Sequence, residues 1–199
     1  MEFIAHRINT IKELKKVPKE YGVEVDLRDF GDRLILQHDP FKDGEDFEKY
    51  LKHYNHGTII LNIKSERIEF RVLDLLIKYK VKDYFFLDCS FPMIYLLSEQ
   101  GEKNIALRFS EFEGLDTIIN MKDKVKWVWV DCFNSFPLND EAYKIIKDNK
   151  LKICIVSPEL LGRGNEIKSY IDIIQNRGFI IDAVCSKISN YIYWNNLIQ

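Results

Sequence analysis

Glu24 and Asp26 lie two residues apart in an otherwise apolar run, and this spacing is typical of a pair of carboxylates that bind a common ligand. Side chains alternate along a strand, so both carboxylates share one face, whereas Val23, Val25 and Leu27 share the other. The apolar face must pack against other elements, and the carboxylates then point into the interior at a strand end. Two inward carboxylates are costly unless they are neutralised, and a divalent cation is the hard partner that oxygen ligands prefer.

Other polar residues fall at the ends of neighbouring predicted strands. Asn62 and Lys64 share a face by the same alternation, so the amide can add a neutral oxygen and the lysine a positive charge. His6 with Arg7, and separately His38, also follow apolar runs in the first third of the chain. Each feature has an ordinary alternative, in which the carboxylates form salt bridges and the histidines pack or cap. Their coincidence favours a functional site.

Short β-branched or aromatic runs alternate with longer amphipathic runs, and these elements must position the polar residues. Eight strands are predicted, over residues 2–6, 23–28, 58–64, 84–88, 104–109, 127–131, 152–156 and 183–186, with an extra run at 33–37. Helices are predicted over 11–16, 47–54, 68–79, 92–99, 115–121, 141–149 and 166–176. Strands that alternate with helices are typical of parallel βαβ units.

Eight strands with eight connections predict a compact, single-domain (β/α)8 TIM barrel over residues 1–199, closed on itself. The rival is an open doubly wound sheet, which usually has a glycine-rich loop after its first strand; here that turn reads His-Arg-Ile-Asn. In a barrel the chemistry lies at the carboxyl ends of the strands. Asp88, Arg108 and Asp131 are therefore candidates for lining the pocket.

The composition argues against several classes of protein. With 29 basic and 31 acidic residues, the formal net charge of −2 lacks the footprint of a nucleic-acid binder. No apolar run is long enough to span a bilayer, and the amino terminus has no signal-peptide pattern. Four widely spaced cysteines are typical of reduced thiols, and together these features predict a cytoplasmic protein.

The order of the polar residues resembles that of the glycerophosphodiester phosphodiesterases. His6-Arg7, Glu24-x-Asp26, His38-Asp39 and an x-Ile-Lys that ends at Lys64 follow one another as in that family. The wider group, the phosphatidylinositol-phospholipase-C-like phosphodiesterases, has a (β/α)8 barrel fold. The quoted matches lie within residues 4–64, and beyond them only the rhythm of strands and helices agrees, including 182–184 near the final strand.

The resemblance implies a role for each matched residue. His6 and His38 would be the general acid and base, Glu24, Asp26 and Asn62 would bind Mg²⁺ or Ca²⁺, and Arg7 and Lys64 would hold phosphate oxygens. The implied activity is that of a metal-dependent hydrolase of a small, glycerophosphodiester-like molecule. A hydroxyl next to the phosphate is the expected attacking group, so the reaction would pass through a cyclic phosphate.

Three departures from the family pattern bear on function. Ile8 stands where the family has glycine, and the following Pro-Glu-Asn-Thr element is missing. Asn62 replaces the usual glutamate, which predicts weaker metal binding, and only residues 40–57 stand where relatives often carry an insertion. Two alternatives therefore stay open. One is a non-catalytic barrel that binds a phosphorylated ligand; the other is a different barrel enzyme, such as a sugar-phosphate isomerase or aldolase, with Lys64 as a reactive amine.

Overall fold

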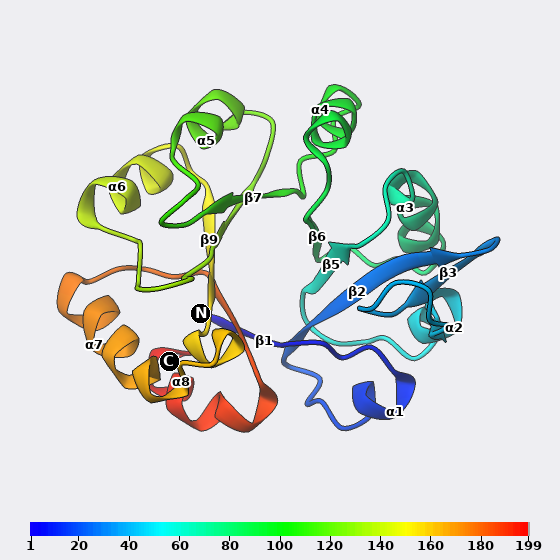
Figure 1. Cartoon of the computed structure of the whole chain (residues 1–199), viewed down its shortest axis with the longest axis horizontal. Coiled ribbons are helices and arrows are strands. Elements are labelled where there is room, and N and C mark those ends of the chain that lie inside the picture. The colour runs from blue at the N-terminus through cyan, green and yellow to red at the C-terminus, as the bar shows by residue number, and fades with distance from the viewer. Residues whose placement is uncertain (199) are drawn as a thin grey trace.

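The computed structural model describes residues 1–198 and shows a curled sheet with helices around its outside (Figure 1). Its parallel strands are β1 (Glu2–Ala5), β2 (Gly22–Phe30), β5 (Ile59–Ile63), β6 (Tyr84–Leu87), β7 (Ala106–Phe109), β8 (Trp127–Val130), β9 (Lys152–Val156) and β10 (Ala183–Ser186). All eight predicted strands are confirmed, with ends that differ by at most two residues. The extra predicted run is β3 (Arg33–Leu36), which returns antiparallel along the end of β2 and pairs with β4 (Glu45–Asp46).

Helices follow the strands in turn and form the outer layer. They are α1 (Ile11–Leu14), α2 (Phe47–Leu51), α3 (Glu69–Lys78), α4 (Phe91–Glu99), α5 (Asp116–Met121), α6 (Asp140–Asp148), α7 (Ile167–Arg177) and α8 (Tyr191–Ile198), with short 3₁₀ turns η1 (Pro158–Leu161), η2 (Gly164–Glu166) and η3 (Ile188–Asn190). In Figure 1 the chain travels once around the centre, from blue at α1 through green at α4 and α5 to orange and red at α7 and α8. The sequence predicted α1 to α7, whereas α8 was missed.

Strand pairing sets the register of the polar residues. On one side of β1 the sheet runs through β2 and β5 to β6, and on the other side through β10, β9 and β8 to β7. In the pair formed by β2 and β5, Glu24 lies beside Ile60 and Asp26 beside Asn62. The alternation along each strand therefore gives Glu24, Asp26, Asn62 and the following Lys64 one common face.

The predicted closed barrel is wrong at one seam, between β6 and β7. The pairing is limited to an isolated bridge between Phe86 of β6 and Ile105, the residue before β7, so the ladder is interrupted there. Just before β7 the backbone satisfies its own donors, since Ile105 N donates to Lys103 O and Asn104 N to Glu102 Oε1. Donors used in a local turn cannot extend the ladder with β6. The result is a curled α/β sheet with barrel order that stays open at this seam.

Apolar packing fills both faces of the strands. Val23, Val25 and Leu27 are fully buried on the face opposite the two carboxylates, as their alternation predicts. Phe85 and Trp127 stack with ring centroids 4.5 Å apart and span the interrupted seam. Within residues 1–198 no helix is both long and apolar enough to cross a bilayer. All four cysteines are free thiols.

Candidate functional site

A cavity of about 560 Å³ lies at the carboxyl ends of the strands. It is lined by His6, Arg7, Glu24, Asn62, Lys64, Leu87, Asp88, Arg108, Trp129, Asp131, Phe133, Val156, Leu160, Leu161 and Lys187. Most of the predicted site residues therefore line a single cavity, including the three candidates from the later strands. Asp26 lies directly beneath it, within ion-pair distance of two of the lining cations.

Glu24 is almost completely buried, and its two oxygens receive different donors. Asn62 Nδ2 donates to Glu24 Oε1 at 2.8 Å, and the backbone N of Arg7 donates to Glu24 Oε2 at 2.8 Å. Arg7 has a φ of 54°, a left-handed conformation that turns its N–H towards this carboxylate. Burial, and then the adjacent Asp26 carboxylate, raise the pKa of Glu24 from 4.5 to about 7. A bound cation would favour the ionised form of this carboxyl.

Asp26 is fully buried and is clamped by a residue of the first loop. Asn9 Nδ2 donates to Asp26 Oδ2 at 2.8 Å, while the backbone N of Asp26 donates to Asn9 Oδ1 at 2.9 Å. Arg7 Nε lies 3.7 Å from Asp26 Oδ2, and Lys64 Nζ lies 3.8 Å from Asp26 Oδ1. The short first loop thus supplies both a positioning amide and a guanidinium to the same carboxylate.

Two buried oxygens of this cluster lack a hydrogen-bond donor among the described residues. They are Asp26 Oδ1 and Asn62 Oδ1, and each belongs to a residue predicted to bind metal. A buried oxygen without a partner is costly, and hard cations such as Mg²⁺ and Ca²⁺ take carboxylate and amide oxygens as ligands. The donor chemistry of Glu24, Asp26 and Asn62 therefore fits a divalent cation. Within the described residues no group of three or more His, Cys, Asp or Glu side chains is placed to hold a metal ion, and the proposed set has two carboxylates and one amide.

Beyond Asp26, charges alternate in sign along one wall of the cavity. Lys64 Nζ donates to Asp88 Oδ2 at 3.3 Å, and Arg108 Nε donates to Asp88 Oδ1 at 2.8 Å. Arg108 also pairs with Asp131, which accepts a further hydrogen bond from Trp129 Nε1 at 3.3 Å. The Asp88–Arg108 ion pair links the residue after β6 to a residue of β7. These pairs preorganise positive charge and hold Lys64 and Arg108 pointing along the cavity wall.

His6 stands at the edge of the cavity, next to the carboxylate pair. Its Nε2 lies 3.8 Å from Glu24 Oε2, and its backbone N donates to Ser186 O at 2.9 Å. Burial, and then the neighbouring Arg7 guanidinium, lower the pKa of His6 from 6.5 to about 4. The imidazole is therefore neutral near pH 7 and has a free acceptor for a proton.

His38 is near this end of the molecule but does not line the cavity. Its Nδ1 lies 3.0 Å from Asp39 Oδ1, and its side chain is 42% exposed. The guanidinium of Arg28 donates to the carbonyl oxygens of both His38 and Lys64, so the two backbones lie side by side. The loop after β3 is thus anchored at the mouth, with its imidazole partly exposed to solvent.

Several residues of the site were not predicted, and the apolar side chains Leu87, Trp129, Val156 and Leu160 are among them. Asn9 lies in an irregular loop, where no periodicity reveals that its amide clamps Asp26. Lys187 follows β10 directly, and the strand-end rule that selected Asp88 would also have selected it. Phe133 and Leu161 follow β8 and β9 within three to five residues and form part of the rim.

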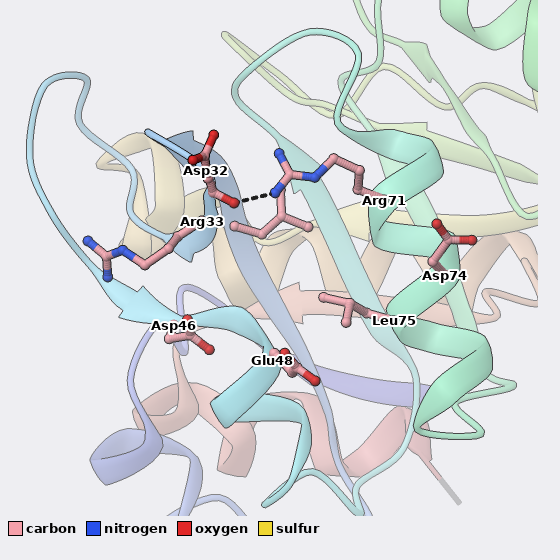
Figure 2. A pocket seen from close by; sticks show the side chains of 8 residues that line it. Asp32, Arg33, Asp46, Glu48, Arg71, Asp74 and Leu75 are labelled. Carbon is pink, nitrogen blue, oxygen red and sulfur yellow. Dashed lines mark hydrogen bonds between the residues drawn. The ribbon is translucent and has the colours of Figure 1, made fainter.

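A second hollow, of about 330 Å³, lies outside the sheet, between the β2–β3 hairpin and helices α2 and α3 (Figure 2). Figure 2 shows acidic and basic side chains around it, with Arg71 donating to the backbone oxygen of Asp32. None of the predicted catalytic, metal-binding or phosphate-binding residues lines this hollow. The chemistry-bearing residues gather instead at the strand ends.

Comparison with known proteins supports the fold. No family model matches the sequence, and no curated protein matches it. Several solved structures match, and two of them cover most of both chains. A glycerophosphodiester phosphodiesterase from Agrobacterium tumefaciens str. C58 has a TM-score of 0.67 at 15% identity, covering 94% of this chain and 97% of its own. A glycerophosphoryl diester phosphodiesterase from Parabacteroides distasonis ATCC 8503 has a TM-score of 0.68 at 12% identity, covering 98% of this chain and 86% of its own. The family resemblance is therefore confirmed at the level of the fold.

Proposed function

We propose that the protein is a metal-dependent phosphodiesterase that cleaves a small, glycerophosphodiester-like phosphodiester at the mouth of the curled sheet. The observation that carries the proposal is the convergence of His6, Arg7, Glu24, Asn62 and Lys64 around one cavity, with Asp26 directly beneath it. Two solved structures of the same fold are described as phosphodiesterases of this kind. Fold alone hosts many reactions, so the proposal depends on the site.

The charge of the site suits a phosphodiester, which has one negative charge on its two non-bridging oxygens. Arg7 is 48% exposed, so its guanidinium can turn from Asp26 to an incoming phosphate. Lys64 is held by two carboxylates and points into the same cavity. In our proposal these two cations hold the phosphate oxygens and stabilise the charge that builds up during displacement.

Proton transfer falls first to His6. Its neutral imidazole can accept a proton from a hydroxyl next to the phosphate, and that hydroxyl oxygen then attacks phosphorus to form a cyclic phosphate. Glu24 lies within reach to stabilise the resulting imidazolium. His38 is proposed as the acid that protonates the leaving alkoxide, from the loop that Arg28 fixes at the mouth.

A divalent cation would be held by Glu24, Asp26 and Asn62, whose oxygens include the two unpartnered ones. Bound there, it would supply additional positive charge for a phosphoryl oxygen. Because Asn62 is neutral, we expect the cation to bind more weakly than in relatives with a third carboxylate.

One observation favours a second candidate, a non-catalytic barrel that binds a phosphorylated ligand. His38, one of the two proposed proton-transfer groups, is not among the residues that line the cavity and is bonded to Asp39. A site with only one histidine in place can still bind phosphate through its cations.

The test measures the hydrolysis of two chromogenic phosphodiesters in the presence of Mg²⁺, Mn²⁺ or Ca²⁺, or of a metal chelator. The first, 2-hydroxypropyl 4-nitrophenyl phosphate, carries a hydroxyl next to the phosphate, and bis(4-nitrophenyl) phosphate does not. We expect metal-dependent release of nitrophenolate, faster from the first substrate, and a loss of about 10²–10⁴-fold in His6→Ala. His53→Ala, at an exposed histidine after α2, is the matched control. Binding of inorganic phosphate without cleavage of either substrate would favour the non-catalytic candidate.

A further inference from the structure

Four cationic side chains line the strand-end cavity, and three of them are held in ion pairs. The three with a carboxylate oxygen within 3.8 Å are Arg7, Lys64 and Arg108. The fourth is Lys187, whose Nζ has neither an ion pair nor a hydrogen bond to any residue that the structure describes. Its side chain is exposed to solvent. The positive charge of Lys187 is therefore available to a ligand in the cavity.

The backbone of Lys187 is fixed by the carboxylate of Glu159. Glu159 Oε1 accepts hydrogen bonds from Lys187 N at 3.0 Å and from Ser186 Oγ at 2.5 Å. Glu159 Oε2 accepts a hydrogen bond from Ser157 Oγ, and Trp194 Nε1 donates to that same hydroxyl at 3.0 Å. Both serines are fully buried, so this network holds the carboxyl ends of β9 and β10 in place. Binding at Lys187 then needs to order only one side chain.

Lys187 stands beside His6 at the ends of two adjacent strands. Ala5 of β1 is in register with Ser186 of β10, and His6 N donates to Ser186 O at 2.9 Å. The next residues along these two strands are His6 and Lys187, and paired strands lie about 5 Å apart. Burial and then Arg7 lower the pKa of His6, and Lys187 acts in the same direction as Arg7. The unpaired lysine is thus a close neighbour of the proposed base.

The order of the strands determines which part of the substrate Lys187 meets. In the proposed reaction His6 takes the proton of the attacking hydroxyl, and the leaving oxygen departs from the opposite side of phosphorus. The half of the substrate that carries the hydroxyl therefore lies towards β1 and β10. Lys64 follows β5, which is separated from β10 by β2 and β1, so the two lysines approach a bound phosphate from different directions.

We infer that Lys187 binds a second anionic group, a carboxylate or a phosphate, on the half of the substrate that carries the attacking hydroxyl. This inference rests on the proposed function for the orientation of that half. A phosphodiester has one negative charge, and Arg7 and Lys64 are the cations proposed to hold it. A further cation without a carboxylate partner, next to the base, is suited to a second negative charge. The substrate class is then a phosphodiester of a hydroxy acid or of a polyol phosphate.

Calorimetry in metal-free buffer of low ionic strength, at about pH 6, tests the inference without any catalytic step. It compares n-propylphosphonate with 3-phosphonopropionate, in which a carboxylate replaces the terminal methyl group. One exposed ion pair should make the second ligand bind about threefold to fivefold more tightly, and added salt should reduce this ratio. Lys187→Gln should bring the ratio to about one, whereas Lys187→Arg should keep it. Lys144→Gln, at an exposed lysine of α6, makes the same change in net charge and should leave the ratio unchanged.

Propane-1,3-diphosphonate, with a second phosphorus group in place of the carboxylate, distinguishes the two anions: the ligand that loses more affinity in Lys187→Gln identifies the group that the lysine binds. Equal affinity of the wild-type protein for all three ligands would overturn the inference and leave the proposed function standing. Equal weakening of all three in Lys187→Gln would assign this lysine to the phosphate itself and would also overturn the inference.

A preference for the second anion that depends on Lys187, without hydrolysis of any phosphodiester, would support the second anion site and contradict the proposed function. Failure to bind any of the phosphonates or inorganic phosphate would overturn both.

Discussion

Replacing Glu24 by glutamine should change how the stability of the metal-free protein depends on pH. The folded state raises the pKa of this carboxyl from 4.5 to about 7, so between these values the folded protein holds a proton that the unfolded chain has lost. The contribution of this carboxyl to the free energy of unfolding is therefore full at low pH. It falls as the pH rises from about 4.5 to about 7 and does not change further above about pH 7. One pKa unit corresponds to about 1.4 kcal/mol, which gives a loss of about 3 kcal/mol.

Glutamine cannot ionise, so Glu24→Gln should not show this loss. The free energy of unfolding of the variant minus that of the wild type should rise by about 3 kcal/mol between pH 4 and pH 8. His6 is present in both proteins, so its effect on stability is largely removed when one free energy is subtracted from the other. Any remainder has the opposite sign, because the pKa of His6 is lowered in the folded state. The glutamine side chain can also be accommodated at position 24. If the Asn62 amide rotates by 180°, its Oδ1, which lacks a donor, can accept a hydrogen bond from the glutamine amide.

Urea denaturation followed by tryptophan fluorescence, in chelator at pH 4, 5, 6, 7 and 8, measures this difference. Glu20→Gln, at an exposed carboxyl, is the control and should follow the wild-type profile. Saturating Ca²⁺ should flatten the wild-type profile, since a cation favours the ionised carboxyl. Parallel profiles for Glu24→Gln and wild type would refute the claim that burial raises the pKa of this carboxyl.

Three further predictions follow from single residues. Asn62→Glu should tighten binding of Mg²⁺ or Ca²⁺ about tenfold or more in calorimetry, and unchanged affinity would remove Asn62 from the cation site. Asn9→Ala should lower the free energy of unfolding by about 2–4 kcal/mol, because it breaks two hydrogen bonds to the buried Asp26; a cost as small as that of the exposed Asn55→Ala would contradict the clamp. Glu69→Met should raise that free energy by about 1–3 kcal/mol, because neither oxygen of this buried carboxyl has a well-formed hydrogen bond among the described residues, and burial raises its pKa more than the nearby Cys89 thiol and backbone N–H groups lower it. The gain from Glu69→Met should grow with pH, and a loss of stability would show that these weaker contacts offset the cost of burial.

The strands and their inward faces could be predicted because they depend on a local rule. Alternation alone set Glu24 and Asp26 on one face and Val23, Val25 and Leu27 on the other, as the structure has them. The same rule predicted a common face for Asn62 and Lys64, whereas the register that sets Asn62 beside Asp26 is known only from the structure.

Closure of the barrel could not be predicted in the same way. Whether β6 and β7 pair depends on which partners the backbone N–H groups of residues 104 and 105 find, and here they bond within a turn. Strand count does not reveal such a local competition. Helix α8 was missed because its aromatic and β-branched residues have modest helix propensity and form no clear stripe.

The loops explain the remaining differences. Asn9 and His38 lie in segments without periodicity, so their side-chain directions depend on tertiary contacts. For Asn9 that contact is the buried Asp26, and for His38 it is Asp39 together with the backbone anchor from Arg28. The sequence placed both near strand ends, but it held no information on which way either side chain points.

The central claim is that this cavity cleaves a phosphodiester through an adjacent hydroxyl with His6 as the base. A ³¹P NMR time course with glycerophosphocholine and Mg²⁺ or Ca²⁺ tests it most directly, because glycerol carries that hydroxyl. We predict a transient cyclic phosphate signal followed by glycerol phosphate for the wild type and for His53→Ala, and a slowing of about 10²–10⁴-fold for His6→Ala. An unchanged phosphodiester signal with every metal, or equal rates for wild type and His6→Ala, would contradict the claim.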